Sequence, residues 1–262
     1  SQRASSLIDL VMQLRMLSLH NERLSEIAFS EPEAEMPVRR VFAENEGIKL
    51  EIKNLSYQYD PFSQPIFSNL DITIEPGESL ALVGPSGVGK TTLLKVMCGL
   101  LSPTSGDVKA NNLSIEKIGL NNYRLSTACV LQEDRLFSGS IAENISCFED
   151  NADMDFIIEC ARHCNIHDEI INMPMGYETL VGELGTGLSG GQKQRLLIAR
   201  ALYRKPGILF MDEATSHLDL NNEANINQSI SSLSITRVIV AHRPSTIASA
   251  DRVIDLSKLA KH

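Results

Sequence analysis

Short apolar runs alternate with helical segments along most of the chain, and this order predicts the architecture. The run SLALVG at 79–84 is apolar throughout, as expected of a strand that is buried on both faces of a sheet. Similar runs occur at 128–132, 207–212, 237–242 and 252–256. Each of the last three adjoins a helical segment, as in βα units. The pattern predicts an α/β fold with a mainly parallel core sheet.

Other stretches extend this architecture. Residues 47–57 and 70–74 predict two more strands, the second of which alternates apolar and polar positions. A helix is expected from about 89 to 99. From about 133 to 202 the pattern is nearly all helical, and this predicts a helical subdomain inserted into the core.

The first 43 residues have a different character. Leu7, Leu10 and Leu14 recur with a helical period, and the stretch SEPEAEMPVRR at 30–40 is rich in Pro and Glu. We therefore expect residues 1–43 to form a helix and an acidic, solvated linker that proteases can reach. The globular domain is expected to begin near Glu44.

Composition narrows the class of protein. The formal net charge of −9 and the lack of a dense Lys/Arg run argue against nucleic acid as a partner. No stretch approaches 18 consecutive apolar residues, so the chain is not expected to span a bilayer. The first nine residues do not predict a secretory signal. Five irregularly spaced cysteines favour a reducing cytosol over a disulfide framework.

One cysteine and histidine cluster has two interpretations. Cys160, His163, Cys164 and His167 share one face of a predicted helix, and both residue types ligate Zn²⁺. Structural zinc sites normally take ligands from two separate elements. Apolar residues are also interspersed in the same turns. An ordinary packed helix is therefore the favoured interpretation.

The strongest chemical motif directly follows the apolar run at 79–84. GPSGVGKT at 84–91 fits the P-loop pattern, in which glycines allow backbone N–H groups to surround phosphates at a helix N-terminus. Lys90 is expected to reach the β- and γ-phosphates, and the Thr91 hydroxyl to bind Mg²⁺. The candidate phosphate-binding residues are Gly84, Pro85, Ser86, Gly87, Val88, Gly89, Lys90, Thr91 and Thr92.

A second motif ends the predicted strand at 207–212. Four apolar residues precede two adjacent carboxylates, Asp212 and Glu213. With a P-loop present, Asp212 is expected on the Mg²⁺ side of the site, and Glu213 is expected to polarise an attacking water. A helix cap is the alternative interpretation of such a pair.

Further motifs resemble one family. LSGGQKQR at 188–195 resembles the signature of ATP-binding-cassette (ABC) proteins, and SHLD at 216–219 resembles that family's D-loop. His242 ends a predicted strand where the family has its switch histidine. Gln132 matches the Q-loop glutamine, and Tyr59 matches the aromatic residue that stacks on the base.

The resemblance extends over residues 48–256 and implies a P-loop NTPase of the ABC type. Such proteins have a mainly parallel core sheet, an antiparallel β subdomain and an inserted helical subdomain. ATP and Mg²⁺ are the implied ligands, and GTP stays open because every base can stack on an aromatic ring. The implied catalytic residues are Lys90, Gln132, Glu213 and His242, with Thr91, Gln132 and Asp212 at the metal. The implied nucleotide-binding residues outside the P-loop are Tyr59, Ser189, Gly190, Gly191, Gln192 and Asp219.

Two phrases resemble exporters within this family, namely LFSGSIAENI at 136–145 and GYETLVGELGTGLSGGQ at 176–192. Leu184 departs from the Arg of many exporters, and this form is similar to Gram-negative exporters of small peptide bacteriocins. LHNERLSEI at 19–27 resembles the end of their last membrane helix. The resemblance implies a transmembrane domain as partner, a periplasmic adaptor and an outer-membrane channel. It also implies that the chain lies at the cytoplasmic face of the bacterial inner membrane.

The resemblance also implies a head-to-tail homodimer, in which the signature of one copy completes the P-loop site of the other. Three rivals remain open at this point. A DNA-repair ATPase would carry long coiled-coil or zinc-bearing insertions, and an importer subunit would lack the exporter phrases. A non-hydrolysing module would be expected to lack some of the catalytic residues.

Overall fold

The computed structural model describes residues 2–29, 32–33, 36–182, 187–214 and 218–259. The chain divides into two compact units, Ser1–Glu35 and Met36–His262, and each is described by itself. Leu184, Ser216 and His217, on which parts of the family resemblance rest, lie outside the described residues.

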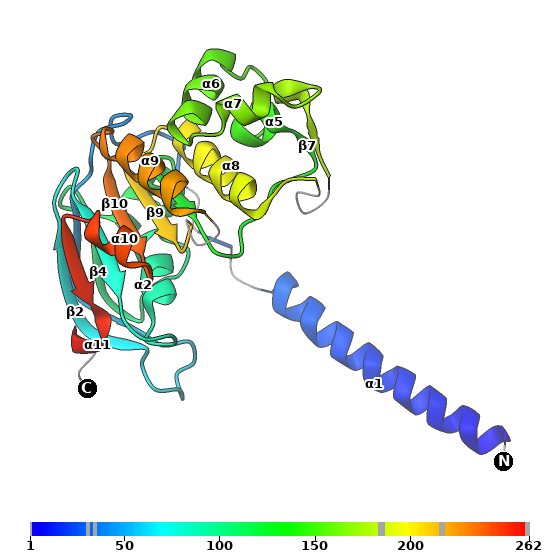
Figure 1. The fold of residues 1–262 in the computed structure, drawn as a ribbon. Coiled ribbons are helices and arrows are strands. Elements are labelled where there is room, and N and C mark those ends of the chain that lie inside the picture. Colours follow the sequence, from blue (N-terminus) through cyan, green and yellow to red (C-terminus); the bar gives the residue numbers. More distant parts are fainter. Residues whose placement is uncertain (1, 30–31, 34–35, 183–186, 215–217, 260–262) are drawn as a thin grey trace. The chain divides into compact units, whose positions relative to one another are not determined.

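The first unit contains helix α1, Gln2–Ala28 (Figure 1). The helix expected in the N-terminal residues is thus confirmed. Apolar side chains of α1 are exposed at Leu10, Met12, Leu14, Met16, Leu17, Leu19 and Leu24. Neither α1 nor any other helix within the described ranges is both long and apolar enough to cross a membrane.

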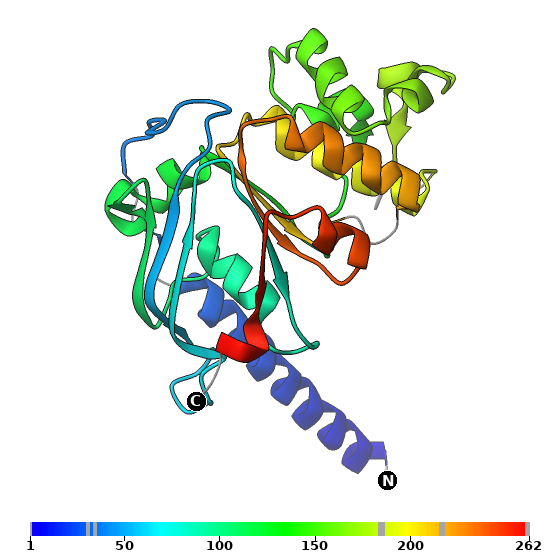
Figure 2. The same cartoon turned by 60° about the vertical axis from the view of Figure 1, so that its left-hand side comes forward.

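The second unit contains a five-stranded sheet with the order β11-β3-β10-β9-β6, in which every pairing is parallel (Figures 1 and 2). Its strands are β3 Ser79–Val83, β6 Thr127–Val130, β9 Ile208–Asp212, β10 Thr236–Val240 and β11 Arg252–Asp255. Strands β9 and β10 are buried along their whole length, because both faces of the sheet are covered. The predicted parallel core is confirmed.

A four-stranded antiparallel sheet with the order β2-β1-β4-β5 covers one side of this core. Its strands are β1 Leu50–Tyr57, β2 Phe67–Ile74, β4 Ser105–Ala110 and β5 Leu113–Ser114. Helix α2, Lys90–Met97, lies between the two sheets (Figure 2). Leu93 and Leu94 of α2 share one apolar cluster with Leu50 of β1 and Val238 of β10, and this cluster joins the two sheets into one body.

A helical layer forms the other side of the unit (Figure 1). Its helices are α5 Ile141–Ile145, α6 Met154–His163, α7 His167–Ile171 and α8 Gly190–Tyr203. Cys160 and Cys164 lie in its apolar core, as the packed-helix interpretation expects, and burial raises the pKa of the Cys160 thiol to about 12. Shorter or later helices are α3 Ile115–Ile118, α4 Leu120–Arg124, α9 Leu220–Ser231, α10 Pro244–Ala248 and α11 Leu256–Leu259.

The helical layer is less uniform than predicted. Strands β7, Gly139–Ser140, and β8, Leu180–Val181, pair antiparallel within it, and a 3₁₀ turn at Gly176–Glu178 precedes β8. The expectation of a nearly all-helical segment is therefore wrong at these positions. Strands of two residues are too short to show a periodic pattern.

The start of the second unit also differs from the boundary expected near Glu44. The segment that follows Met36 hydrogen-bonds to α4: the Arg39 N–H donates to Asn122 Oδ1 at 2.8 Å, and Asn122 Nδ2 donates to the Pro37 carbonyl at 3.2 Å. Asn121 Nδ2 donates to the Met36 carbonyl at 2.8 Å. Asparagine side chains thus satisfy the backbone of a segment whose composition resembles a solvated linker.

We predict that limited proteolysis stops near Met36 in the wild type and advances to about Glu44 in Asn122→Ala. Asn122 is buried, and its loss leaves the Arg39 N–H and the Pro37 carbonyl without this partner. The free energy of unfolding should fall by about 1–3 kcal/mol. Asn172→Ala, which removes an exposed asparagine elsewhere, is the control. An unchanged cleavage boundary in Asn122→Ala would contradict this account of the segment.

Candidate nucleotide-binding site

The parallel sheet brings four of the predicted motifs to one edge. The P-loop follows β3, His242 follows β10, Asp212 ends β9 with Glu213 directly after it, and Gln132 follows β6. These four strands are consecutive neighbours in the sheet. Since parallel strands end at the same edge, all four motifs meet at the carboxyl edge, where α/β sheets bind ligands.

The P-loop has the backbone conformation that a phosphate cradle requires. Gly87 and Gly89 have φ angles of 81° and 97°, in the left-handed region that favours glycine. A Cβ atom at Gly89 would lie 2.4 Å from Ile66 Cγ2. Gly89 is also the N-cap of α2 and offers no side-chain acceptor, so the first N–H groups of the helix stay available to an anion.

Lys90 is bound by the P-loop itself. Its ammonium donates to the carbonyls of Gly84 and Pro85, both at 2.9 Å, and the side chain is buried. These two carbonyls compensate the charge of Lys90 only partly, because neither is an anion. A nucleotide phosphate would provide the missing negative charge.

Asp212 and Thr91 have the chemistry expected of a magnesium site. The Asp212 carboxylate is buried and hydrogen-bonds to the Thr91 side chain, while its Oδ1 has no hydrogen-bond partner among the described residues. Burial is the main cause that raises its pKa, and the neighbouring Glu213 charge raises it further. A carboxylate and a hydroxyl are hard oxygen donors of the kind that Mg²⁺ prefers, so these residues fit the ion.

Gln132 does not join this pair within the part of the chain that the structure describes. It lies exposed in the turn after β6 and forms no hydrogen bond to Thr91 or Asp212. Its predicted contact with the metal remains a prediction. The adjacent Glu133 does connect the turn to the P-loop helix, because its carboxylate accepts a hydrogen bond from Lys95 of α2 at 2.8 Å.

Glu213 and His242 contact each other directly. Glu213 Oε1 lies 2.9 Å from His242 Nε2, and both side chains are partly exposed. Glu213 has a φ of 52°, a left-handed conformation that is unfavourable for a residue with a Cβ atom. Strain of this kind is common at functional sites, and here the strained residue is the one that contacts His242.

The signature residues form a separate site at the start of α8. Ser189 is the N-cap, and its hydroxyl accepts from the Gln192 N–H while Gln192 Oε1 accepts from the Ser189 N–H. Ser189, Gly190 and Gly191 line a groove of about 490 Å³ together with Asp219. No P-loop residue lines this groove, so the chain does not bring its own signature to its own P-loop.

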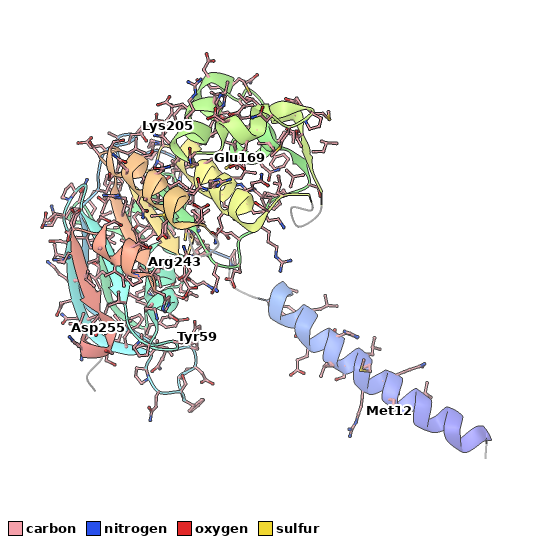
Figure 3. All side chains as sticks on the ribbon, in the orientation of Figure 1. Met12, Tyr59, Glu169, Lys205, Arg243 and Asp255 are labelled. Carbon is pink, nitrogen blue, oxygen red and sulfur yellow. The ribbon has the colours of Figure 1, made fainter. Side chains whose placement is uncertain are left out.

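Tyr59 lies near the P-loop helix. Its hydroxyl is 3.1 Å from Thr92 Oγ1, the residue is 64% exposed, and the Tyr57 ring lies edge-on at 5.0 Å. An exposed ring face is available for a base to stack on. Figure 3 shows Tyr59 far from Glu169, which lines the signature groove in the helical layer.

Two ion pairs support these motifs and were not predicted. Under the signature, Glu169 of α7 accepts from Gln192 Nε2 at 2.9 Å and from Arg195. After β10, Arg243 donates to buried Glu223 at 3.0 Å and to the Leu218 carbonyl at 2.7 Å. These pairs join residues from separate elements, so no local motif reveals them.

Comparisons with known proteins agree with this arrangement. The family model described as ABC transporter matches residues 67–216, which is more than half of the chain. The chain belongs to the ABC transporter family, as one of its ATP-binding domains.

The chain is 57% identical to the colicin V secretion/processing ATP-binding protein of Escherichia coli over 98% of its own length. It is 55% identical to a probable microcin-H47 secretion/processing ATP-binding protein of the same species. It spans about 37% of the length of either relative. A solved bacterial Atm1-family ABC exporter with ATP bound is similar at 32% identity and a TM-score of 0.80, over 92% of this chain and 43% of that one.

We predict that Glu213→Gln retains nucleotide binding but lowers the hydrolysis rate by roughly 10²-fold or more, since the amide cannot accept a proton from water. Equilibrium binding and single-turnover hydrolysis measure the two effects separately. Glu133→Gln, which changes a neighbouring turn carboxylate, is the control. Full turnover in Glu213→Gln would mean that another group acts as the general base, and His242 would be the first candidate.

We predict that Asp212→Asn keeps or raises the melting temperature while weakening Mg²⁺-dependent nucleotide binding. The raised pKa means that the fold disfavours the charged carboxylate, so a neutral isostere removes an unfavourable contribution. For the same reason wild-type stability should rise as pH falls through this pKa, while Mg²⁺ binding weakens. Calorimetry with and without Mg²⁺ measures the melting temperature and the Mg²⁺-dependent binding of nucleotide. A large loss of stability in Asp212→Asn without Mg²⁺ would contradict the role of Asp212 as a metal ligand.

Proposed function

We propose that the chain is the ATP-hydrolysing motor of an ABC exporter. The observation that carries this proposal is the convergence of the P-loop, Asp212, Glu213 and His242 at one edge of the sheet. A non-hydrolysing module would not require all of these groups together. Stacking on Tyr59 does not distinguish between bases, so GTP is the alternative nucleotide.

When nucleotide binds and is hydrolysed, the residues at the strand ends would give up their present partners and contact phosphate, Mg²⁺ or water instead. Lys90 would leave the Gly84 and Pro85 carbonyls and pair with the β- and γ-phosphates. Thr91 and Asp212 would hold Mg²⁺, which neutralises phosphate charge when bound. Glu213 would release His242 and accept the proton of the attacking water, and His242 would then donate to the γ-phosphate.

A complete site would need two copies of the chain. The signature groove and the P-loop are separate within one copy, and Ser189 to Gly191 present a helix N-terminus that suits a phosphate. Head-to-tail pairing would place this end of α8 over the nucleotide of the partner. Nucleotide would then supply the charge that favours closure of the dimer.

The cargo and the remaining partners are inferred from the relatives. Their names refer to colicin V and microcin secretion, and we propose that a peptide bacteriocin is the cargo here too. The chain would work at the cytoplasmic face of the bacterial inner membrane, attached to a transmembrane domain. A periplasmic adaptor and an outer-membrane channel would complete the export route.

We predict that the chain is mainly monomeric without nucleotide and dimerises when ATP is bound but not hydrolysed, so that Glu213→Gln accumulates the dimer. Ser189→Arg should abolish this dimer, because the added bulk and charge lie at the partner's nucleotide. Ser189→Ala removes the same capping bond without bulk, and it should dimerise with at most a modest loss. Light scattering measures the dimer.

Mixing two defective chains tests the composite site. A Lys90→Ala chain and a Ser189→Arg chain should each be inactive, while the heterodimer regains one intact site from Lys90 of one copy and Ser189 of the other. Single-turnover hydrolysis reports that site. Heterodimers that form without recovering hydrolysis would contradict the proposed pairing.

A further inference from the structure

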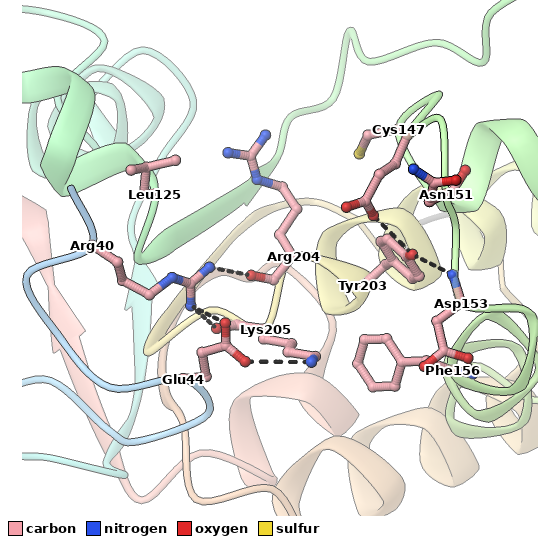
Figure 4. A pocket seen from close by; sticks show the side chains of 12 residues that line it. Arg40, Glu44, Leu125, Cys147, Asn151, Asp153, Phe156, Tyr203, Arg204 and Lys205 are labelled. Atoms are coloured by element: carbon pink, nitrogen blue, oxygen red, sulfur yellow. Dashed lines mark hydrogen bonds and ion pairs between the residues drawn. The ribbon is translucent and has the colours of Figure 1, made fainter. Parts of the chain in front are cut away.

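The segment 40–45, which we call the strap, lies against the C-terminal end of the signature helix α8 (Figure 4). The Arg40 guanidinium donates to the Arg204 carbonyl at 3.2 Å and to the Lys205 carbonyl at 3.3 Å. Glu44 lies 3.5 Å from Arg40 and 3.3 Å from the Lys205 ammonium, and the Asn45 N–H donates to the Lys205 carbonyl at 3.4 Å. Four polar contacts thus join the strap to two consecutive residues at this helix end, and the Arg40–Glu44 pair lies within the strap.

The chemistry of the contact matches the end of a helix. The last carbonyls of an α-helix have no partner within the helix and carry its partial negative charge. Arg40 supplies a cation with two donors to carbonyls at that end. The strap therefore binds the helix terminus itself, in addition to the side chains around it.

Lys205, the residue that follows the end of α8, also contacts the strap and a neighbouring helix. Its φ of 50° is left-handed, at the position after a helix where glycine is preferred. The lysine side chain instead contacts Glu44, and its ammonium lies 4.9 Å from the centre of the Phe156 ring on α6. A residue with an unfavourable backbone conformation thus connects the strap to two helices of the helical layer.

The two ends of α8 therefore have different partners. Its first turn carries Ser189, Gly190 and Gly191, and the strap is attached about 20 Å away at the opposite end of the same helix. The strap also belongs to the stretch of chain that connects Ser1–Glu35 to the rest of the second unit. The strap is thus attached to the far end of the helix that carries the signature.

We propose that Arg40 is a positioning residue for the signature, because the strap fixes the C-terminal end of α8. This inference rests on the proposed two-copy site, because the signature acts on the partner's nucleotide. If the strap is loosened, the signature should bind the partner's nucleotide more weakly. The P-loop, Glu213 and His242 of the same chain should stay unchanged.

Arg40→Ala in the 262-residue chain tests this proposal. We expect the KM for ATP, and the ATP concentration for half-maximal dimerisation of Glu213→Gln, to rise about three- to tenfold, as for loss of a charged hydrogen-bonded contact. The kcat at saturating ATP should change less than about twofold. Arg40→Lys, which retains the charge, should recover part of the effect.

Arg39→Ala is the matched control, since it removes the same charge one position earlier. Among the described contacts, Arg39 binds the body only through its backbone N–H. Equal KM values in Arg40→Ala and Arg39→Ala, with the wild type active, would overturn the proposal and leave the proposed function intact. An inactive wild type would instead contradict the proposed function.

Two further measurements distinguish an effect on the position of the signature from an effect on stability or on hydrolysis. Lys205→Gly relieves the left-handed backbone but removes the contact with Glu44, so we expect an unchanged or higher melting temperature together with a raised KM. Amide exchange at Gly190–Gln192 in the nucleotide-free chain should be faster in Arg40→Ala than in Arg39→Ala. Equal exchange rates would overturn the proposal whether or not the chain hydrolyses ATP.

Discussion

The parallel pairing of β3, β10, β9 and β6 is the constraint on which the rest of the molecule depends. Both faces of this sheet are covered, so its strands must be apolar along their length, and polar chemistry can only begin where they end. Parallel pairing makes those ends coincide. Lys90, Asp212, Glu213 and His242 therefore meet although they are separated by up to about 150 positions in the sequence.

The charged groups at this edge find only part of their hydrogen-bond and ion-pair partners in one another. Lys90 is paired with carbonyls instead of an anion, and Glu213 is strained and bound to His242. One oxygen of Asp212 has no hydrogen-bond partner in the described part of the chain. Each of these arrangements costs some stability and would be relieved by a phosphate, a cation or a water. The nucleotide-free chain is thus organised for ligands that it does not itself supply.

The strands that end at this edge were predicted from the sequence because the pattern of each strand is local. A buried apolar run followed by glycines and a lysine, or by two carboxylates, lies within one short window of the chain. The two-residue strands β7 and β8, the start of the body at Met36 and the pairs Glu169–Arg195 and Glu223–Arg243 were not predicted. Each depends on contacts between separate elements. The contact of Arg40 with Lys205 joins positions 165 residues apart and leaves no local pattern.

The central claim is that one active site takes its P-loop from one chain and its signature from another. Cross-linking between two differently tagged chains tests this most directly, with Ser86→Cys in one and Ser189→Cys in the other. Both positions are exposed, and both chains should carry Glu213→Gln, with Cys147→Ser to remove the exposed native thiol. We predict a short-linker cross-link between the chains that forms with ATP and Mg²⁺ and is nearly absent without nucleotide. Cross-linking that does not depend on ATP, or that occurs within one monomeric chain carrying both cysteines, would contradict the account.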